Sequence, residues 1–146
     1  MASPRVRWWA VALLVAQAPP VLWLVFVADG WTVNRLVVRI WVTLLSWGLL
    51  PPATTPEQMD LALNVVMLVP AAALLVVAFP RTGWWWAPLL TMLGSMTIEL
   101  GQHYLLQGRS GELIDVITNT LGGVIGAGLG WLVNRALAGR ERRRTG

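Results

Sequence analysis

The chain of 146 residues has no cysteine, no lysine, one histidine and few charged residues of any kind. The absence of cysteine excludes disulfide bonds, thiolate metal sites and cysteine nucleophiles. Charged residues make up 12% of the chain, whereas a soluble domain usually has about 25%. One histidine with scattered carboxylates is a weak metal signal, so we predict no metal and no cofactor.

Apolar residues, by contrast, make up 56% of the chain, and there are ten tryptophans against one tyrosine and two phenylalanines. Tryptophan favours the headgroup level of a bilayer, so this composition predicts an integral membrane protein. The net charge of +4 comes entirely from arginine. Because the arginines lie between apolar segments and near the ends of the chain, they indicate membrane topology, and nucleic-acid binding is not predicted.

Four apolar segments are close to the roughly 20 residues that span a bilayer. The predicted fold class is therefore an all-α, polytopic membrane helical bundle. It forms one domain over residues 1–139 and is followed by a basic cytoplasmic tail at 140–146. The four predicted spans are residues 8–28, 61–79, 84–106 and 113–137.

The first of these segments contains Pro19 and Pro20. It could be a cleaved signal peptide, but its apolar run is longer than usual for one, so a retained and kinked helix is favoured.

The segment 31–50 allows two interpretations. Its polar side chains recur three or four positions apart, at Thr32, Arg35, Arg39, Thr43 and Ser46. This spacing forms one helical stripe, which suits an amphipathic helix lying in the membrane interface. A fifth span is the alternative, but it would reverse every later loop and remove the charge asymmetry described next.

Arginine is distributed unevenly between the two sides of this four-span topology. One side would hold Arg5, Arg7, Arg81, Arg135, Arg140, Arg142, Arg143 and Arg144. The other would hold Arg35, Arg39 and Arg109. Because cytoplasmic loops carry the excess of arginine, we predict a multi-pass protein of the bacterial cytoplasmic membrane with both termini cytoplasmic.

Two spans begin alike. "DLALN" places Asp60 four residues before Asn64, and "DVITN" places Asp115 four residues before Asn119. Residues four apart share a helix face, so we expect two similar polar pairs at one depth in the outer half of the membrane. Helix capping alone would explain the aspartates, but it leaves the asparagines unexplained.

The third span carries a narrow polar face that ends in Glu99, Gln102 and His103, and Arg109 follows within two turns. Glu99 lies about 22 Å along this span, at outer-leaflet depth. A carboxylate there is costly unless it is paired, protonated or hydrated, so we expect it to face the interior of the bundle. The alternative is that these groups only hydrogen-bond across helices and hold the bundle together.

The fourth span carries glycine at Gly122, Gly126 and Gly130, on one face with Asp115 and Asn119. Small residues four apart let a neighbouring helix approach closely. We therefore expect tight helix packing in the inner half and polar groups in the outer half.

The pattern E-x-x-Q…R…D-x-x-x-N-x-x-G-x-x-x-G, which starts at Glu99, resembles the VanZ-like family of small bacterial integral membrane proteins. Asp60, Asn64 and Pro70 also fit, whereas Ala72 stands where the family often has glycine and His103 lies outside the pattern. The resemblance implies a membrane protein of the cell envelope. The family's named member is linked to teicoplanin resistance, but no settled activity follows.

The polar residues predict one binding site in the outer leaflet. It would comprise Asp60, Asn64, Glu99, Gln102, Arg109, Asp115 and Asn119. Our first hypothesis is that it holds the headgroup of an anionic envelope lipid or cell-wall precursor, with Arg109 pairing its phosphate or carboxylate.

Other functions remain open at this point. A hydrolase or transferase could use Glu99 or His103 as base, but nothing of recognised form supports catalysis. A proton-coupled carrier or a purely structural subunit are further alternatives. The pattern permits a monomer or a homo-oligomer.

Overall fold

The computed structural model describes residues 3–105 and 113–145, without the side chains of residues 102–105, 142, 144 and 145. Within these ranges the chain is helical and has no strand, which confirms the predicted all-α class. The helices are α1 (Pro4–Phe26), α2 (Gly30–Ser46), α3 (Pro56–Ala78), α4 (Trp86–Leu105) and α5 (Leu113–Thr145).

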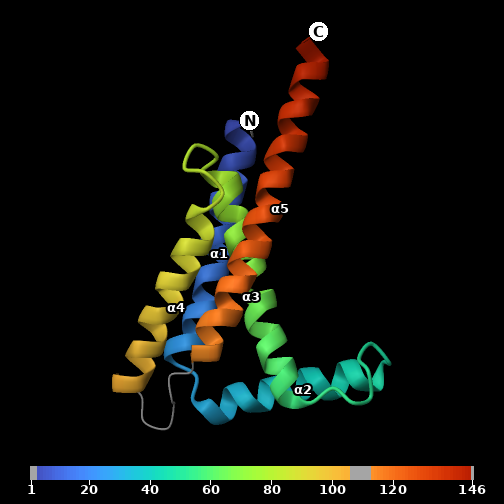
Figure 1. Ribbon diagram of the computed structural model, residues 1–146, viewed down its shortest axis with the longest axis vertical. Helices are drawn as coiled ribbons and strands as arrows, with labels where there is room; N and C mark the ends of the chain where they lie inside the picture. The colour runs from blue at the N-terminus through green and yellow to red at the C-terminus, as the bar shows by residue number, and fades with distance from the viewer. Residues whose placement is uncertain (1–2, 106–112, 146) are drawn as a thin grey trace.

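Four of these helices run lengthwise, and α2 lies across one end of them (Figure 1). The helices α3 and α5 run in the same direction and make the most extensive contact, while α4 packs mainly on α5 and α1 on α3. Both ends of the chain lie at the end opposite α2, where α5 projects beyond its neighbours. We call these the α2 end and the terminal end.

Within the described residues, three helices are long and apolar enough to cross a membrane: α1, α3 and the part Leu113–Glu141 of α5. The fourth lengthwise helix, α4, has 20 residues and is not among them. Three of the four predicted spans are therefore supported by length and composition.

Local sequence sets where the helices begin. Ser3 accepts a hydrogen bond from the amide of Val6 at the start of α1, and Asp29 does the same for Thr32 at the start of α2. Thr55 and Gln58 form a reciprocal capping box at the start of α3. Each side chain satisfies an amide that has no partner within its helix. These caps fix the two sharp changes of direction on either side of α2.

Prolines lie inside two of the helices without ending them. The helix α1 continues through Pro19 and Pro20, and α3 continues through Pro70. Between them, the Gln17 side chain of α1 donates a hydrogen bond from Nε2 to the carbonyl of Met67, at 3.2 Å. A side chain of α1 thus bonds the backbone of α3 three residues before its proline.

Small residues form the core at the terminal end. Ala72, Val76, Ala87 and Ala127 make one buried cluster. Ala10, Val77 and Ala78 make a second cluster between α1 and α3. Many large apolar side chains are instead exposed on the outside of the helices, as expected where lipid is the solvent.

The helix α2 is amphipathic in its contacts as well as in its sequence. Val37 faces the bundle and is 6% exposed, whereas Trp31 and Trp47 are at least 70% exposed. The Trp41 indole donates a hydrogen bond to the carbonyl of Thr54, which ties α2 to the loop that leads into α3. The helix is therefore amphipathic, as predicted, and it crosses the bundle end instead of running lengthwise with the other four helices.

Candidate ligand-binding site

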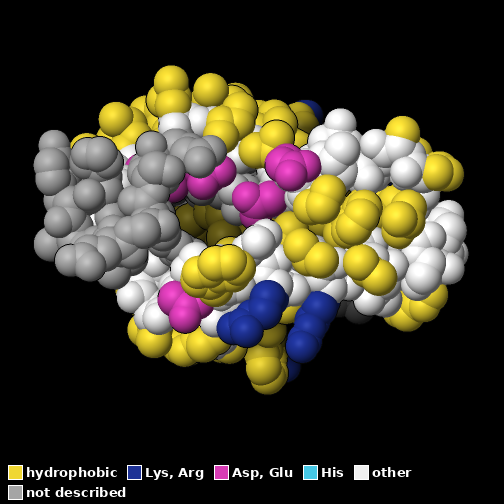
Figure 2. Space-filling model, turned by 90° about the horizontal axis from the view of Figure 1, so that it is seen from below, with side chains coloured by type: hydrophobic (Ala, Val, Ile, Leu, Met, Phe, Trp, Pro, Cys, Tyr) yellow, Lys and Arg dark blue, Asp and Glu magenta, His cyan; other side chains and the backbone are white. Residues whose placement is uncertain are grey.

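A cavity of about 570 Å³ lies at the α2 end. The end of α1, one face of α2, the first half of α3 and single turns of α4 and α5 all contribute to its lining. Seen from the α2 end, acidic side chains border a hollow whose interior is apolar (Figure 2). Its size falls within the range of about 300–1,000 Å³ that is usual for small-molecule sites.

The structure brings five of the predicted site residues to this one cavity. They are Asp60, Asn64, Glu99, Asp115 and Asn119, each partly buried. They come from three helices, and the two asparagines hold those helices together.

Asn64 connects α3 to α5. Its Nδ2 donates a hydrogen bond to Oδ1 of Asp115, at 2.9 Å. A charge-assisted bond of this kind is stronger than one between neutral groups. It keeps the Asp115 carboxylate at the cavity wall.

Asn119 connects α5 to α4. Its Nδ2 donates to Oγ of Ser95, at 2.9 Å, and Ser95 is only 4% exposed. The other amide atom, Oδ1, is buried and accepts no hydrogen bond from the residues that the structure describes. The asparagine of each repeated pair therefore joins two helices. Helix capping by the aspartates alone would not explain these two bonds.

The two repeated pairs lie at nearly the same depth. Gly122 of α5 lies against the carbonyl of Val65 in α3, and the two helices run in parallel. Asp115 lies seven residues before Gly122, and Asp60 lies five residues before Val65. The two aspartates thus differ in depth by about 3 Å along the helix axes.

Three glycines of α5 allow this close parallel packing. Gly122, Gly126 and Gly130 lie against successive turns of α3, at the carbonyls of Val65, Val69 and Ala73. A Cβ on Gly126 would lie 2.8 Å from that of Ala72. Gly123, beside this stripe, faces Thr91 of α4. Beyond the cavity, α3 and α5 therefore meet almost backbone to backbone.

The comparisons with known proteins give the family of the chain. The model of the VanZ/LLP1 family matches residues 10–134, which is most of the chain. The chain belongs to the VanZ/LLP1 family. No curated protein and no solved structure matches it.

Part of the VanZ/LLP1 motif lies outside the described residues. Arg109 falls within 106–112, and the side chains of Gln102 and His103 belong to the last turn of α4, where only the backbone is described. In the described part, no group of three histidine, aspartate or glutamate side chains is arranged to hold a metal ion.

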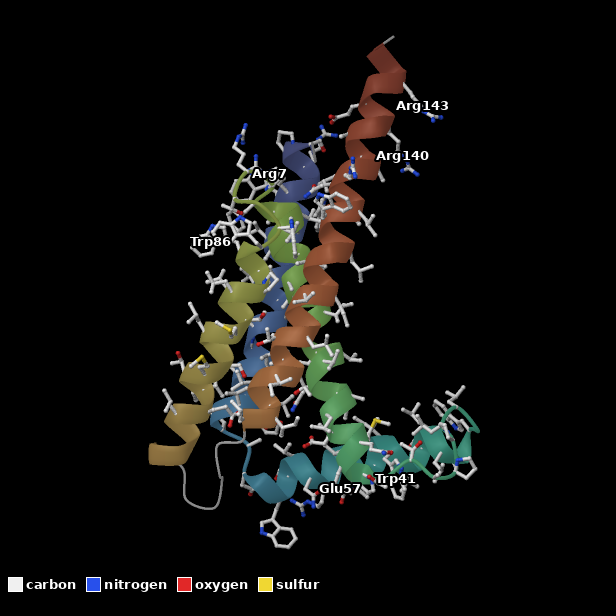
Figure 3. The ribbon with its side chains drawn as sticks, viewed as in Figure 1. Arg7, Trp41, Glu57, Trp86, Arg140 and Arg143 are labelled. Atoms are coloured by element: carbon white, nitrogen blue, oxygen red, sulfur yellow. The ribbon has the colours of Figure 1, made fainter. Side chains whose placement is uncertain are left out.

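The cavity of this VanZ/LLP1 protein has two polar lining residues that the sequence analysis missed. Glu57 lies at the mouth, near the start of α3 (Figure 3). Its spacing of three residues from Asp60 and seven from Asn64 could have revealed it as part of the same stripe. Asn34 lies on the α2 face that points to the cavity. The spacing of apolar residues around Asn34 gave no comparable signal.

Two further residues, at the terminal end, were also missed. Arg7 of α1 donates from Nε to the carbonyl of Ala78, at 3.0 Å, and Asn134 of α5 donates from Nδ2 to the carbonyl of Val76, at 2.9 Å. Both carbonyls belong to the last turn of α3, where no intrahelical donor follows. Side chains from α1 and α5 therefore satisfy carbonyls at the end of α3 and connect the three helices there.

Proposed function

We propose that the cavity binds the headgroup of an anionic envelope lipid or of a lipid-linked cell-wall precursor. The observation that carries this proposal is the convergence of Asp60, Asn64, Glu99 and Asp115 from three helices on one cavity. Polar residues of a membrane bundle are costly unless they serve packing or function. A cavity lined by them offers room for a ligand, which a purely structural set of hydrogen bonds would not need.

The lining suggests how such a headgroup would be held. Carboxylates accept hydrogen bonds from hydroxyl, amide or ammonium groups, all of which are common in envelope headgroups. The amides of Asn64 and Asn119 keep the carboxylate of Asp115 and the α4–α5 contact in place. The phosphate of the ligand is expected to pair with Arg109, whose guanidinium suits bidentate binding.

We also propose that α4 is the fourth span. It has 20 residues, which is about 30 Å of helix and enough for the hydrocarbon core. It packs along α5, an apolar helix of sufficient length to span. Trp84 and Trp85 precede it at the terminal end and Trp86 is its first residue, so that all three would anchor it in an interface.

The orientation follows from the charges. Arg7, Arg140 and Arg143 lie at the terminal end (Figure 3), as does Arg135, which stacks over the ring of Trp131 at 4.5 Å. This arrangement supports the proposal of a cytoplasmic terminal end in a bacterial membrane, with the cavity in the outer leaflet.

Because the chain has no cysteine, single cysteines can test this orientation directly. A membrane-impermeant maleimide added to intact cells should label Ala53→Cys, in the loop after α2, but not Thr82→Cys, before α4. Labelling of Ser110→Cys from outside would support α4 as a span. The reverse pattern would contradict the topology.

Headgroup binding also offers a route to altered glycopeptide susceptibility, because a held precursor is less available to an antibiotic outside the membrane. If so, a cavity variant such as Asn64→Leu should change teicoplanin susceptibility when expressed at the wild-type level. A variant with wild-type susceptibility would separate binding from resistance.

The carrier and enzyme alternatives receive less support. A carrier needs a path through the terminal end, yet there α3 and α5 pack at Gly126 and Gly130 with almost no intervening side chains. An enzyme could use Glu99 or His103 as general base, but the sequence has no nucleophile or metal motif of recognised form beside them. We therefore propose binding rather than catalysis.

Native mass spectrometry of the purified protein tests the proposal. We expect a phosphate-bearing lipid to co-purify with the wild type and to be reduced at least about tenfold in Arg109→Ala, which corresponds to about 1.4 kcal/mol of binding free energy. Arg81→Ala removes the same charge from an exposed position at the terminal end and serves as control. Retention of the lipid by Arg109→Ala would contradict the proposal. The same spectra give the number of subunits.

A further inference from the structure

The cavity has an apolar wall as well as a polar one, and α3 contributes to both. Glu57, Asp60 and Asn64 follow one another along one line of that helix, and Leu63 and Met67 form a neighbouring line. The polar line faces α5, since Asn64 bonds to Asp115. The apolar line borders the same cavity as the end of α1, and the carbonyl of Met67 accepts a bond from Gln17 of α1.

The rest of the apolar wall comes from the end of α1 and from α2. Leu24 and Val25 contribute from α1. From α2, the contributing apolar residues are Val33, Leu36, Val37 and Ile40. Their spacing of three and four residues puts them on one face, which is turned into the cavity. Together with Leu63 and Met67 of α3, they form an apolar wall beside the polar one, around a single cavity.

The apolar wall is open to the outside at its rim. Leu36 is 43% exposed and Val66 is 62% exposed, although both line the cavity. They belong to α2 and α3, which meet at the α2 end, where α2 crosses the bundle. In a membrane this rim would adjoin the interface between headgroups and acyl chains, because α2 has the character of an interfacial helix.

We propose that the apolar wall is an acyl-chain subsite, so that the ligand of the cavity is a whole lipid rather than a free headgroup. This inference rests on the proposed function, because the polar wall must hold the headgroup. An acyl chain is the occupant that fits an apolar wall beside a polar one, with a rim that adjoins the bilayer. A water-soluble ligand would leave Leu63, Val66 and Met67 without an apolar partner.

The experiment compares variants that fill the apolar wall with a matched variant elsewhere. Val66→Trp and Leu36→Trp each add bulk at the rim, from two different helices. Val124→Trp adds the same bulk on α5, at a residue that is 44% exposed and does not line the cavity. Thermal unfolding in detergent establishes that each variant is folded before binding is measured.

Binding is measured by native mass spectrometry with two probes. One is dioctanoyl-phosphatidylglycerol, and the other is glycerophosphoglycerol, which is the same headgroup without its chains. For the wild type we expect the lipid to bind at least about a hundredfold more tightly than the headgroup alone. Val66→Trp and Leu36→Trp should lose at least about tenfold in lipid binding, while Val124→Trp should match the wild type.

The outcomes separate this inference from the proposed function. If both rim variants bind the lipid as Val124→Trp does, the subsite is wrong while headgroup binding stands. An equal loss of the headgroup-only probe in Val66→Trp would mean that the whole cavity is blocked, and it would also contradict an acyl-chain role. If the wild type binds neither probe and no lipid co-purifies with it, the proposed function fails and the subsite fails with it.

Discussion

The same two helices, α3 and α5, are joined in different ways at the two ends of the bundle. Towards the terminal end, Gly126 and Gly130 let the backbones meet at the carbonyls of Val69 and Ala73. At the α2 end, the helices are joined instead by the hydrogen bond between Asn64 and Asp115, beside a cavity. At the terminal end the backbones of α3 and α5 are therefore in close contact. At the α2 end polar side chains join the two helices, and a cavity lies beside them.

This difference indicates a division of roles along the bundle. Helix backbones that meet directly at glycines make many close contacts, and helices packed in this way cannot easily move relative to each other. A polar pair beside a cavity stabilises less, since hydrogen bonds between membrane helices contribute about 0.6 kcal/mol on average. We infer that the terminal end supplies most of the stability, and that the α2 end can exchange its interactions with a ligand.

The largest expected effect is at the terminal end. Gly126→Ala should destabilise the protein by about 1–3 kcal/mol, because the added Cβ meets the backbone and side chains of α3. Gly128, two residues on, has no atom within 4 Å of an added Cβ. Gly128→Ala should therefore be neutral or stabilise by about 0.5–1 kcal/mol. The free energy of unfolding in detergent measures both effects. Equal values for the two variants would contradict the claim that close packing of α5 on α3 stabilises the terminal end.

A second prediction compares one asparagine from each end. Asn134→Leu removes the donor to the carbonyl of Val76, and Asn64→Leu removes the donor to Asp115. Each should cost about 0.6–1.7 kcal/mol of stability. Only Asn64→Leu should also lower the amount of co-purifying lipid, by at least about tenfold. Thermal unfolding and native mass spectrometry on the same preparations measure both quantities.

Equal lipid loss in both asparagine variants would show that binding simply follows stability. That result would favour a purely structural role for the polar residues at the α2 end.

The smallest expected change in stability concerns the contact between α1 and α3. Gln17→Leu removes the bond to the carbonyl of Met67 and should cost about 0.6 kcal/mol. Thr97→Val is the matched control, because the Thr97 hydroxyl bonds only within its own helix, to the carbonyl of Leu93. Its expected cost is near zero. A larger loss in the control would mean that the measurement reports helix propensity instead of the contact between helices.

Much of the fold could be predicted from the sequence because its signals are local. Apolar length indicates α1, α3 and α5, and the spacing of Gly122, Gly126 and Gly130 indicates a helix that meets a neighbour closely. The repeated Asp60/Asn64 and Asp115/Asn119 pairs correctly pointed to one depth. Family membership followed from the same residues and is confirmed by the match over 10–134.

The parts that could not be predicted depend on how helices are placed relative to one another. Asn34 lines the cavity because α2 crosses the bundle end, and no local pattern sets that crossing. Arg7 and Asn134 reach carbonyls of α3 that are distant in sequence. The count of four spans stays a prediction, because α4 is not among the helices that are long and apolar enough to span by length and composition.

The most direct test of the central claim is to compare Glu99→Gln with Glu141→Gln. Glu99 lines the cavity, and Glu141 is exposed near the end of α5, so both variants lose one charge with little change in shape. For Glu99→Gln we expect at least about tenfold less co-purifying lipid, with a Tm within about 2 °C of the wild type. Glu141→Gln should match the wild type in both. Unchanged lipid retention in Glu99→Gln, or a loss that follows a fall in Tm, would contradict a ligand site at the α2 end.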